Sequence, residues 1–213
     1  MQQMRNRTMK SADLATLRAL HGRKRWEHIW AYYKLPIIGI LIVLYIFGYA
    51  AYRHFTKKEA VLYVNLVDIS AGSDLTGQLT DGFAQYAHLT KKQQVNLLTG
   101  LIINETANVD EQYIYASELK LLAAVSAQQL DVILMDTAAR DQLQDEEYFL
   151  DLCTLDADFS SLDELSADGL TLDISDTPLI AQAGFEESVY LGIIANAPHP
   201  ERAAAYIRYL LQQ

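Results

Sequence analysis

The side chains best placed to do chemistry follow two apolar runs of the sequence. An aspartate and a serine come at the end of "AVLYVNLVD" (60–68) or just after it, and an aspartate and a threonine follow "DVILM" (131–135). In open α/β sheets, ligands bind outside the carboxyl ends of the strands. If both runs are strands, these side chains share one rim, where we expect a small ligand or a partner to bind. The candidate ligand-binding residues are Asp68, Ser70, Asp136 and Thr137.

Each of these polar residues also has a purely structural interpretation. Ser73 is expected to cap a helix, and Asp136 or Thr137 is expected to cap the next helix, at about 138–146. For Asp136 the sequence leaves both roles open. Asp131, at the entry of the same strand, lies opposite the ligand rim. Its carboxylate is predicted to accept backbone N–H bonds, so its role should be in folding.

An acidic segment, "DADFSSLDE" (156–164), begins like a calcium-binding loop but does not continue as one. Ser161 stands where the loop turn needs glycine, and Ala167 stands where a bidentate glutamate is needed. A solvated acidic face is the default interpretation of such a segment. A looser calcium site remains an alternative, with the ligands Asp156, Asp158, Asp163 and Glu164.

Residues 59–213 carry no recognisable catalytic motif. They contain no GxSxG, HExxH or paired-cysteine motif, and their two histidines, His88 and His199, fit structural turns at helix ends. We therefore expect no enzyme activity, no metal and no cofactor. The same residues hold 25 acidic against six basic side chains, a net charge of −19, which would repel the phosphates of nucleic acid.

The order of the expected elements defines the fold class. After the strand at 60–68 come a helix from Ser73, a strand at 94–103, a helix carrying Ile114 and Leu121, and the strand at 131–135. This alternation is typical of an α/β fold with an open, mostly parallel sheet and helices on both faces. The sequence then predicts three further elements: a weak helix at 138–146, a strand at 189–196 and a last helix opened by Pro200.

The first sixty residues have a different character. Residues 1–34 hold eight basic against two acidic residues, a net charge of +6, and residues 35–52 hold no charge at all. At about 1.5 Å per helical residue, eighteen residues span about 27 Å, close to the hydrocarbon thickness of a bilayer. We therefore expect a transmembrane helix at 35–55, with the lipid bilayer as a partner.

The basic residues set the expected orientation. The positive-inside rule places the tail, 1–34, in the cytoplasm and the acidic domain, 60–213, outside the cell membrane, after a short linker at 56–59. The competing interpretation is a cleaved signal peptide, since Gly48 and Ala50 are small enough for a cleavage site. A charged lead of 34 residues is long for a signal peptide, which favours an uncleaved signal anchor.

Three segments resemble one lobe of the extracytoplasmic solute-binding proteins of ABC importers, the type II periplasmic-binding fold. They are "VLYVNLVD", then "YIYASELKLLAAVSAQQLDVILMD" with the following "FLDLCTL", and "VYLGIIANAPHPERAAAYIRYLL". The last looks like the family's late strand and the helix that returns to the first lobe. The resemblance implies a single solute-binding-like lobe outside the membrane. The entry to the apolar run, "WEHIWAYYK", is also similar to that of uncharacterised single-pass proteins of Gram-positive bacteria.

The departures from that family shape the expected function. About fifty residues separate Asp136 from Val189, too few for a second lobe, and a predicted membrane helix replaces a lipid-anchored cysteine. We therefore expect a non-catalytic binding or docking module for an envelope or transporter partner. The alternatives are a small extracytoplasmic hydrolase that uses carboxylates, and a structural envelope protein.

The topology is testable with protease added to intact cells. We expect digestion of the residues beyond 59 and survival of the basic tail, because the positive-inside rule places only the acidic domain outside. Immunoblotting with tags at both ends measures this. A protected C-terminus would contradict the orientation, and a shortened, soluble mature chain would indicate cleavage near Ala50.

Overall fold

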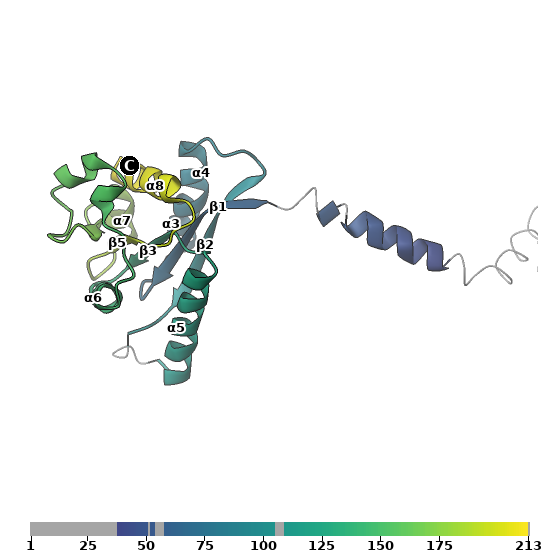
Figure 1. The fold of residues 1–213 in the computed structure, drawn as a ribbon, viewed down its shortest axis with the longest axis horizontal. Helices are drawn as coiled ribbons and strands as arrows, with labels where there is room; N and C mark the ends of the chain where they lie inside the picture. Colours follow the sequence, from purple (N-terminus) through teal and green to yellow (C-terminus); the bar gives the residue numbers. More distant parts are fainter. Residues whose placement is uncertain (1–37, 51, 54–57, 105–108, 213) are drawn as a thin grey trace, which may run out of the picture. The chain divides into compact units, whose positions relative to one another are not determined.

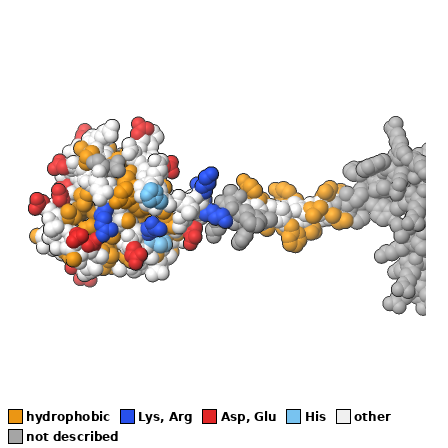
Figure 2. All heavy atoms as spheres, turned by 90° about the horizontal axis from the view of Figure 1, so that it is seen from above, with side chains coloured by type: hydrophobic (Ala, Val, Ile, Leu, Met, Phe, Trp, Pro, Cys, Tyr) orange, Lys and Arg blue, Asp and Glu red, His pale blue; other side chains and the backbone are white. Residues whose placement is uncertain are grey.

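The computed structural model describes residues 38–50, 52–53, 58–104 and 109–212. The chain divides into two compact units, Met1–Lys57 and Lys58–Gln213. In the first unit, residues 38–50 are helical, with exposed apolar side chains around them (Figure 2). Within the described ranges, no helix is both long and apolar enough to cross a membrane. The predicted tail and the ends of the predicted span lie outside the described residues, so the membrane helix stays a prediction.

The second unit is built on a five-stranded open sheet in the order β2-β1-β3-β5-β4 (Figure 1). Strand β1 pairs in parallel with β2 and β3, whereas β5 is antiparallel to both β3 and β4. The first three predicted strands, β1, β2 and β3, are therefore parallel, as the sequence predicted. The unpredicted β4 runs in the same direction, and β5 runs opposite to the other four, so the sheet is mixed. The strands are β1 (Glu59–Val67), β2 (Gln93–Leu101), β3 (Val132–Met135), β4 (Thr171–Asp173) and β5 (Tyr190–Ile193).

Helices cover both faces of the sheet. Side chains along a β-strand alternate between the two faces, so neighbouring residues of one strand join different cores. Leu134 of β3 joins a core with α3, α4, α7 and α8, while its neighbours Ile133 and Met135 join a second core with α5 and α6. The helices are α3 (Ser73–Gly77), the π-helix η1 (Gln78–Gly82), α4 (Phe83–Tyr86), α5 (Glu111–Ser126), α6 (Thr137–Asp145), the 3-10 helices η2 (Leu152–Thr154) and η3 (Ala157–Ser161), α7 (Pro178–Ala183) and α8 (Pro200–Leu211).

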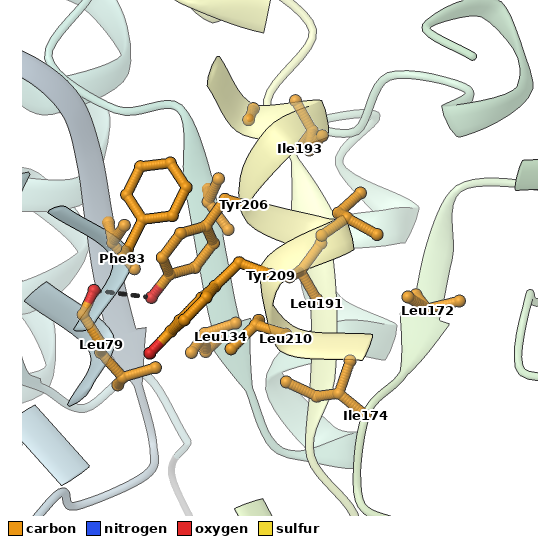
Figure 3. Packing of buried hydrophobic residues seen from close by; sticks show 14 of the residues in the cluster. Leu79, Phe83, Leu134, Leu172, Ile174, Leu191, Ile193, Tyr206, Tyr209 and Leu210 are labelled. Carbon is orange, nitrogen blue, oxygen red and sulfur yellow. Dashed lines mark hydrogen bonds between the residues drawn. The ribbon is translucent and has the colours of Figure 1, made fainter. Parts of the chain in front are cut away.

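The larger core depends on two tyrosines of α8 (Figure 3). The hydroxyl of Tyr206 donates to the Leu79 carbonyl at 3.1 Å, and that of Tyr209 donates to the Gln78 carbonyl at 2.8 Å. Both carbonyls belong to η1, a π-helix, which is a rare form found mostly as single turns within α-helices. A Cβ at Gly82 would lie 2.3 Å from the Tyr209 hydroxyl, so only glycine admits this contact. Burial raises the pKa of Tyr206 well above its usual value.

The segment between α6 and β5 differs most from the sequence-based expectation. It contains β4 and α7, which the sequence did not predict, as well as η2 and η3. It folds against the same sheet: Leu150 donates its N–H to the carbonyl of Ile193, and Ile174 donates to Val189. The late strand is also shorter than predicted, at Tyr190–Ile193, because the chain turns into the approach to α8 after it.

One buried carboxylate links three elements at the amino end of β3. Asp131 is fully buried, and one of its oxygens accepts the backbone N–H of Tyr63 at 2.8 Å. The other oxygen, Oδ1, accepts the backbone N–H of His199 at 2.7 Å. The ring nitrogen Nδ1 of His199 lies 3.1 Å from Oδ2, the oxygen that accepts from Tyr63. The backbone of Asp131 also bonds to Tyr63 and to Ile194. The predicted folding role of Asp131 therefore agrees with its contacts, which reach β1 and the start of α8 rather than its own turn.

We predict that Asp131→Asn lowers stability by about 3 kcal/mol, or about 6–12 °C in the melting temperature. The amide would keep one oxygen as the acceptor for one of the two backbone N–H groups, but would turn its NH₂ group toward the other and leave that donor without an acceptor. Thermal unfolding followed by circular dichroism measures the change. The control is Asp141→Asn, which removes a 62 % exposed carboxylate paired with Arg140 and should cost less than about 0.5 kcal/mol. Equal melting temperatures for the two variants would contradict the anchoring role of Asp131.

Candidate functional site: the carboxyl rim of the sheet

Three of the four sequence-predicted site residues meet in one hollow. A cavity of about 280 Å³ lies at the carboxyl ends of β2, β1 and β3, beside the point between β1 and β3 where the strand order reverses. Ligands of open α/β sheets bind at such a point. Thr137 is the first residue of α6 and does not line the cavity. The lining side chains and backbone belong to Asp68, Ile69, Ser70, Gly100, Leu101, Ile102, Asn104, Asp136 and Glu187.

Asp68 is the most unusual residue of this cavity. Its backbone has a φ of 57°, in the left-handed region that few residues other than glycine adopt, although aspartate and asparagine are enriched there. Its Oδ1 accepts the backbone N–H groups of Ile103 and Asn104, at 3.0 and 3.4 Å, which ties the end of β1 to the chain that follows β2. Its Oδ2 is buried and has no hydrogen-bond partner among the described residues.

Burial raises the pKa of the Asp68 carboxyl, and the negative charge of Asp136 raises it further. The two backbone N–H bonds act in the opposite direction because they favour the ionised form. An ionised carboxylate with one buried, unpartnered oxygen is a poor choice for stability alone. A cationic or hydrogen-bond-donating group in the cavity would supply the missing partner.

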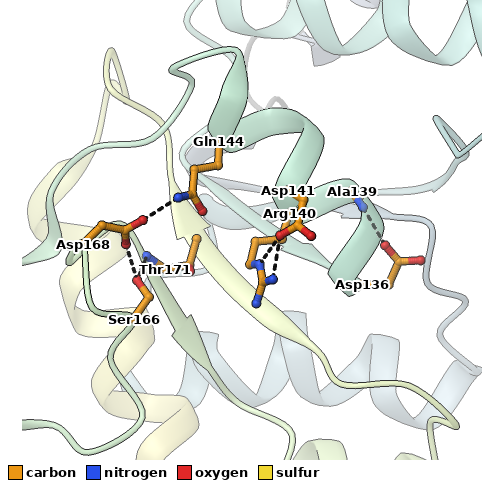
Figure 4. A network of polar contacts seen from close by, with 8 residues as sticks. All are labelled: Asp136, Ala139, Arg140, Asp141, Gln144, Ser166, Asp168 and Thr171. Atoms are coloured by element: carbon orange, nitrogen blue, oxygen red, sulfur yellow. Dashed lines mark hydrogen bonds and ion pairs between the residues drawn. The ribbon is translucent and has the colours of Figure 1, made fainter.

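Asp136 combines the two roles that the sequence left open. It is the N-cap of α6, where its Oδ1 accepts the Ala139 N–H at 2.8 Å (Figure 4), and it also lines the cavity. The prediction that Asp136 or Thr137 caps this helix is therefore confirmed for Asp136. The matching prediction for Ser73 is wrong. Gly72 is the N-cap of α3, and the Ser73 hydroxyl lies 3.4 Å from the side chain of Asp74 instead.

A second hollow extends the rim on the side of α3. It has a volume of about 450 Å³, and it shares Ser70, which is exposed, with the first cavity. Its walls come from α3 and α7, which lie against each other. Sequence reasoning missed both Glu187 and the α7 wall. Pro178 in the first turn and Gly184 at the left-handed end of α7 are signals that could have located that helix. Nothing in the sequence marks Glu187.

The carboxylates considered for calcium do not form one site. Asp156 is the N-cap of η3 and pairs with Arg208, whereas Asp163 and Glu164 line a separate hollow beside Arg140. Within the described part of the chain, no group of three or more histidine, cysteine or acidic side chains could hold a metal ion.

Polar contacts fix the chain just after this acidic segment against α6 (Figure 4). Gln144 of α6 donates to Asp168, and Asp168 accepts the Ser166 hydroxyl at 2.6 Å, which lowers the pKa of the Asp168 carboxyl. The guanidinium of Arg140 lies 4.1 Å from the centre of the Tyr190 ring. These contacts have a structural role. The rim cavity is therefore the candidate functional site.

Comparison with known proteins adds no family to this description. No family model matches the chain, and neither a curated protein nor a solved structure matches it.

We predict that Asp68→Asn stabilises the domain at neutral pH. Asparagine tolerates the left-handed backbone and keeps an acceptor for the Ile103 N–H, while it removes a partly buried charge. The folded-state pKa of Asp68 is raised above its unfolded value, so the wild type loses stability as pH rises through the unfolded and then the folded pKa. The gain should be about 0.5–1 kcal/mol at pH 7, after discounting for partial exposure.

Thermal melts at several pH values test whether Asp68→Asn raises or lowers the stability of the domain. The difference between Asp68→Asn and wild type should vanish below the usual aspartate pKa of 3.8, where the carboxyl is protonated in both the folded and the unfolded chain, and grow above it. The control is Asp81→Asn on an exposed position of η1. A variant less stable than wild type at pH 7 would show that the Asp68 charge supports the fold.

Proposed function

We propose that the chain is a single-pass membrane protein whose extracytoplasmic domain is one solute-binding-like lobe, used as a non-catalytic docking module. The rim formed by Asp68, Ser70 and Asp136 would receive a partner from the envelope or from a transporter. The observation that carries the proposal is the meeting of these three residues in one cavity at the carboxyl ends of β1 and β3.

The connectivity supports the single-lobe part of the proposal. The late strand β5 lies beside β3 and α8 packs on β1, in agreement with a late strand and helix that return to the first lobe. The residues between α6 and β5 form η2, η3, β4 and α7 on the same sheet. The rim therefore has no opposing lobe within the described residues, and a partner would have to supply the other wall.

The charge of the rim supports a cationic partner surface. Asp68, Asp136 and Glu187 line one hollow, and Asp74 lines the adjoining hollow. The basic residues of the domain are few, and none of those that the structure describes lines either hollow. A lysine or arginine side chain would neutralise this edge and could pair with the unpartnered oxygen of Asp68.

The hydrolase alternative receives less support from the same residues. The raised pKa of Asp68 is what a general acid needs. However, one oxygen of Asp68 is held by two backbone N–H groups and one oxygen of Asp136 is held by its helix. Each carboxylate thus has one oxygen fixed by backbone N–H groups. Residues 59–213 carry no recognisable catalytic motif to act with the other oxygen, which favours docking over acid–base chemistry.

Photocrosslinking in native membranes tests the proposal. A benzoylphenylalanine at Ser70 should give a discrete crosslinked partner, because this exposed residue joins the two hollows. Asp136→Ala in the same chain should reduce the crosslink at least five-fold while costing only about 1 kcal/mol of stability, the usual loss for a helix cap.

The same photocrosslinker at Ser160 of η3, also exposed, serves as the control. It should not capture the partner. Capture of the same protein from both positions would reject the rim as the docking surface. Turnover of a substrate by the purified chain, abolished by Asp68→Asn, would establish the hydrolase instead.

A further inference from the structure

The exposed hydrophobic surface of the folded domain is concentrated on β2 and α5. Within residues 58–104 and 109–212, six large hydrophobic side chains are exposed, and five of them lie on these two elements. We name this surface the β2–α5 flank, formed by Gln93–Leu101 and Glu111–Ser126. A soluble surface rarely gathers its apolar side chains in one place without a partner. The five are Leu98, Tyr113, Tyr115, Leu119 and Leu122.

The flank also contains an edge strand with little protection. Among the described residues β2 pairs only with β1, and its nine residues carry no charge. Long uncharged edges are templates for pairing with another strand, and proteins usually block them with charges or bulges. The pairing of β2 with β1 has two register shifts: the first places an extra residue on β1, between Ala60 and Leu62, and only the second places one on β2, near its end, where Gly100 has a φ of 76°. The regular part of the edge therefore runs from Gln93 to Leu98.

Strand and helix form one continuous surface. The Tyr113 hydroxyl of α5 donates to the Gly100 carbonyl of β2 at 2.5 Å, so the first turn of α5 lies at the end of β2. Leu98 is 40 % exposed on the strand, and Tyr115 is 62 % exposed on the helix. A partner strand on the β2 edge would therefore lie beside exposed apolar side chains as well as open backbone groups.

The charge distribution makes a second copy of the chain a suitable occupant. Residues 91–126 hold three basic and four acidic side chains, a net charge of −1, whereas the rest of 59–213 holds three basic and 21 acidic side chains, a net charge of −18. The rest of the domain is negative on average, so pairing two copies through it would on average bring like charges together. The β2–α5 flank is nearly neutral, so it avoids that repulsion.

We infer that the β2–α5 flank is a homodimer interface in which the two β2 strands pair antiparallel about a two-fold axis. Such an interface is self-complementary. Lys91 and Lys92 precede β2, and Asp110 and Glu111 begin α5 near its other end. Antiparallel pairing places the lysines of one copy beside the acids of the other, twice. The two sheets then join into one of ten strands, twice the five of one domain.

Disulfide crosslinking of the full chain in membranes tests the pairing. In a Cys153→Ser background, cysteines at Gln94, Asn96 and Leu98 lie on one face of β2. Directly opposite antiparallel residues lie about 4.5–5.5 Å apart at Cα, within disulfide reach. Only the residue on the two-fold axis faces its own copy, so we expect a dimer band on mild oxidation from one of the three single cysteines or from a mixture of two of them. Cysteine at Gln182 of α7, which is exposed, should give none.

A charge placed on the β2 edge tests the same interface, with the molecular mass of the protein in solution as the readout. Leu98→Lys should weaken dimerisation at least ten-fold, measured by light scattering of the full chain in detergent, whereas Gln182→Lys should leave the dimer unchanged. Leu98 is exposed, so the lysine should not unfold the domain, and a thermal melt checks this. A wild-type monomer at all concentrations would overturn the inference. So would a dimer insensitive to Leu98→Lys, or crosslinks only to a different protein.

Discussion

The domain depends on one buried carboxylate at the amino end of its central strands. Asp131 holds the N–H of Tyr63 on β1 and that of His199, the residue before α8, with its two oxygens. Both donors belong to half-buried residues and would otherwise lack this acceptor. Hydrogen bonds between an ionised acceptor and backbone N–H groups are among the stronger ones in proteins. Asp131 stabilises the amino end of β3. The carboxyl end of the sheet can therefore carry polar groups whose hydrogen bonding is incomplete.

The carboxyl end of the sheet shows that contrast. Asp68 has a left-handed backbone, a raised pKa and one oxygen without a partner among the described residues. Asp136 stabilises α6 and still faces the cavity. Locally unfavourable groups of this kind tend to mark functional sites, where a ligand completes the missing interactions. Asp131 and Asp136 are five residues apart, yet they serve opposite ends of the same strand.

Sequence reasoning was most successful where one element is long enough to show a pattern. Two apolar runs were enough to predict β1 and β3, their parallel direction and three of the residues that line the rim cavity. Pro200 was enough to predict the start of α8. It failed for β4 and α7, because elements of three and six residues show no measurable periodicity. It also placed a cap at Ser73, since a serine side chain and a neighbouring Gly72 both satisfy the preference for N-caps.

The rim could be predicted only in part for a related reason. Residues that directly follow a strand can be assigned to its carboxyl end, which located Asp68, Ser70 and Asp136. Glu187 reaches the same cavity from a loop before β5, and its place depends on the antiparallel direction of that strand. No local pattern specifies that direction. The orphaned oxygen of Asp68 is likewise visible only in three dimensions.

The central claim is that Asp131 fixes one end of the sheet and that the rim at the other end receives a partner. Hydrogen–deuterium exchange of the full chain, compared between native membranes and purified protein in detergent, tests this claim most directly. We expect amides around Tyr63 and His199 to exchange equally slowly in both samples, because Asp131 holds them without help from a partner. If the proposed docking partner is present in native membranes, amides of the rim, at 68–72 and 136–140, should exchange more slowly there. Equal exchange of the rim in both samples, with partner-dependent protection at the Asp131 end, would contradict the claim.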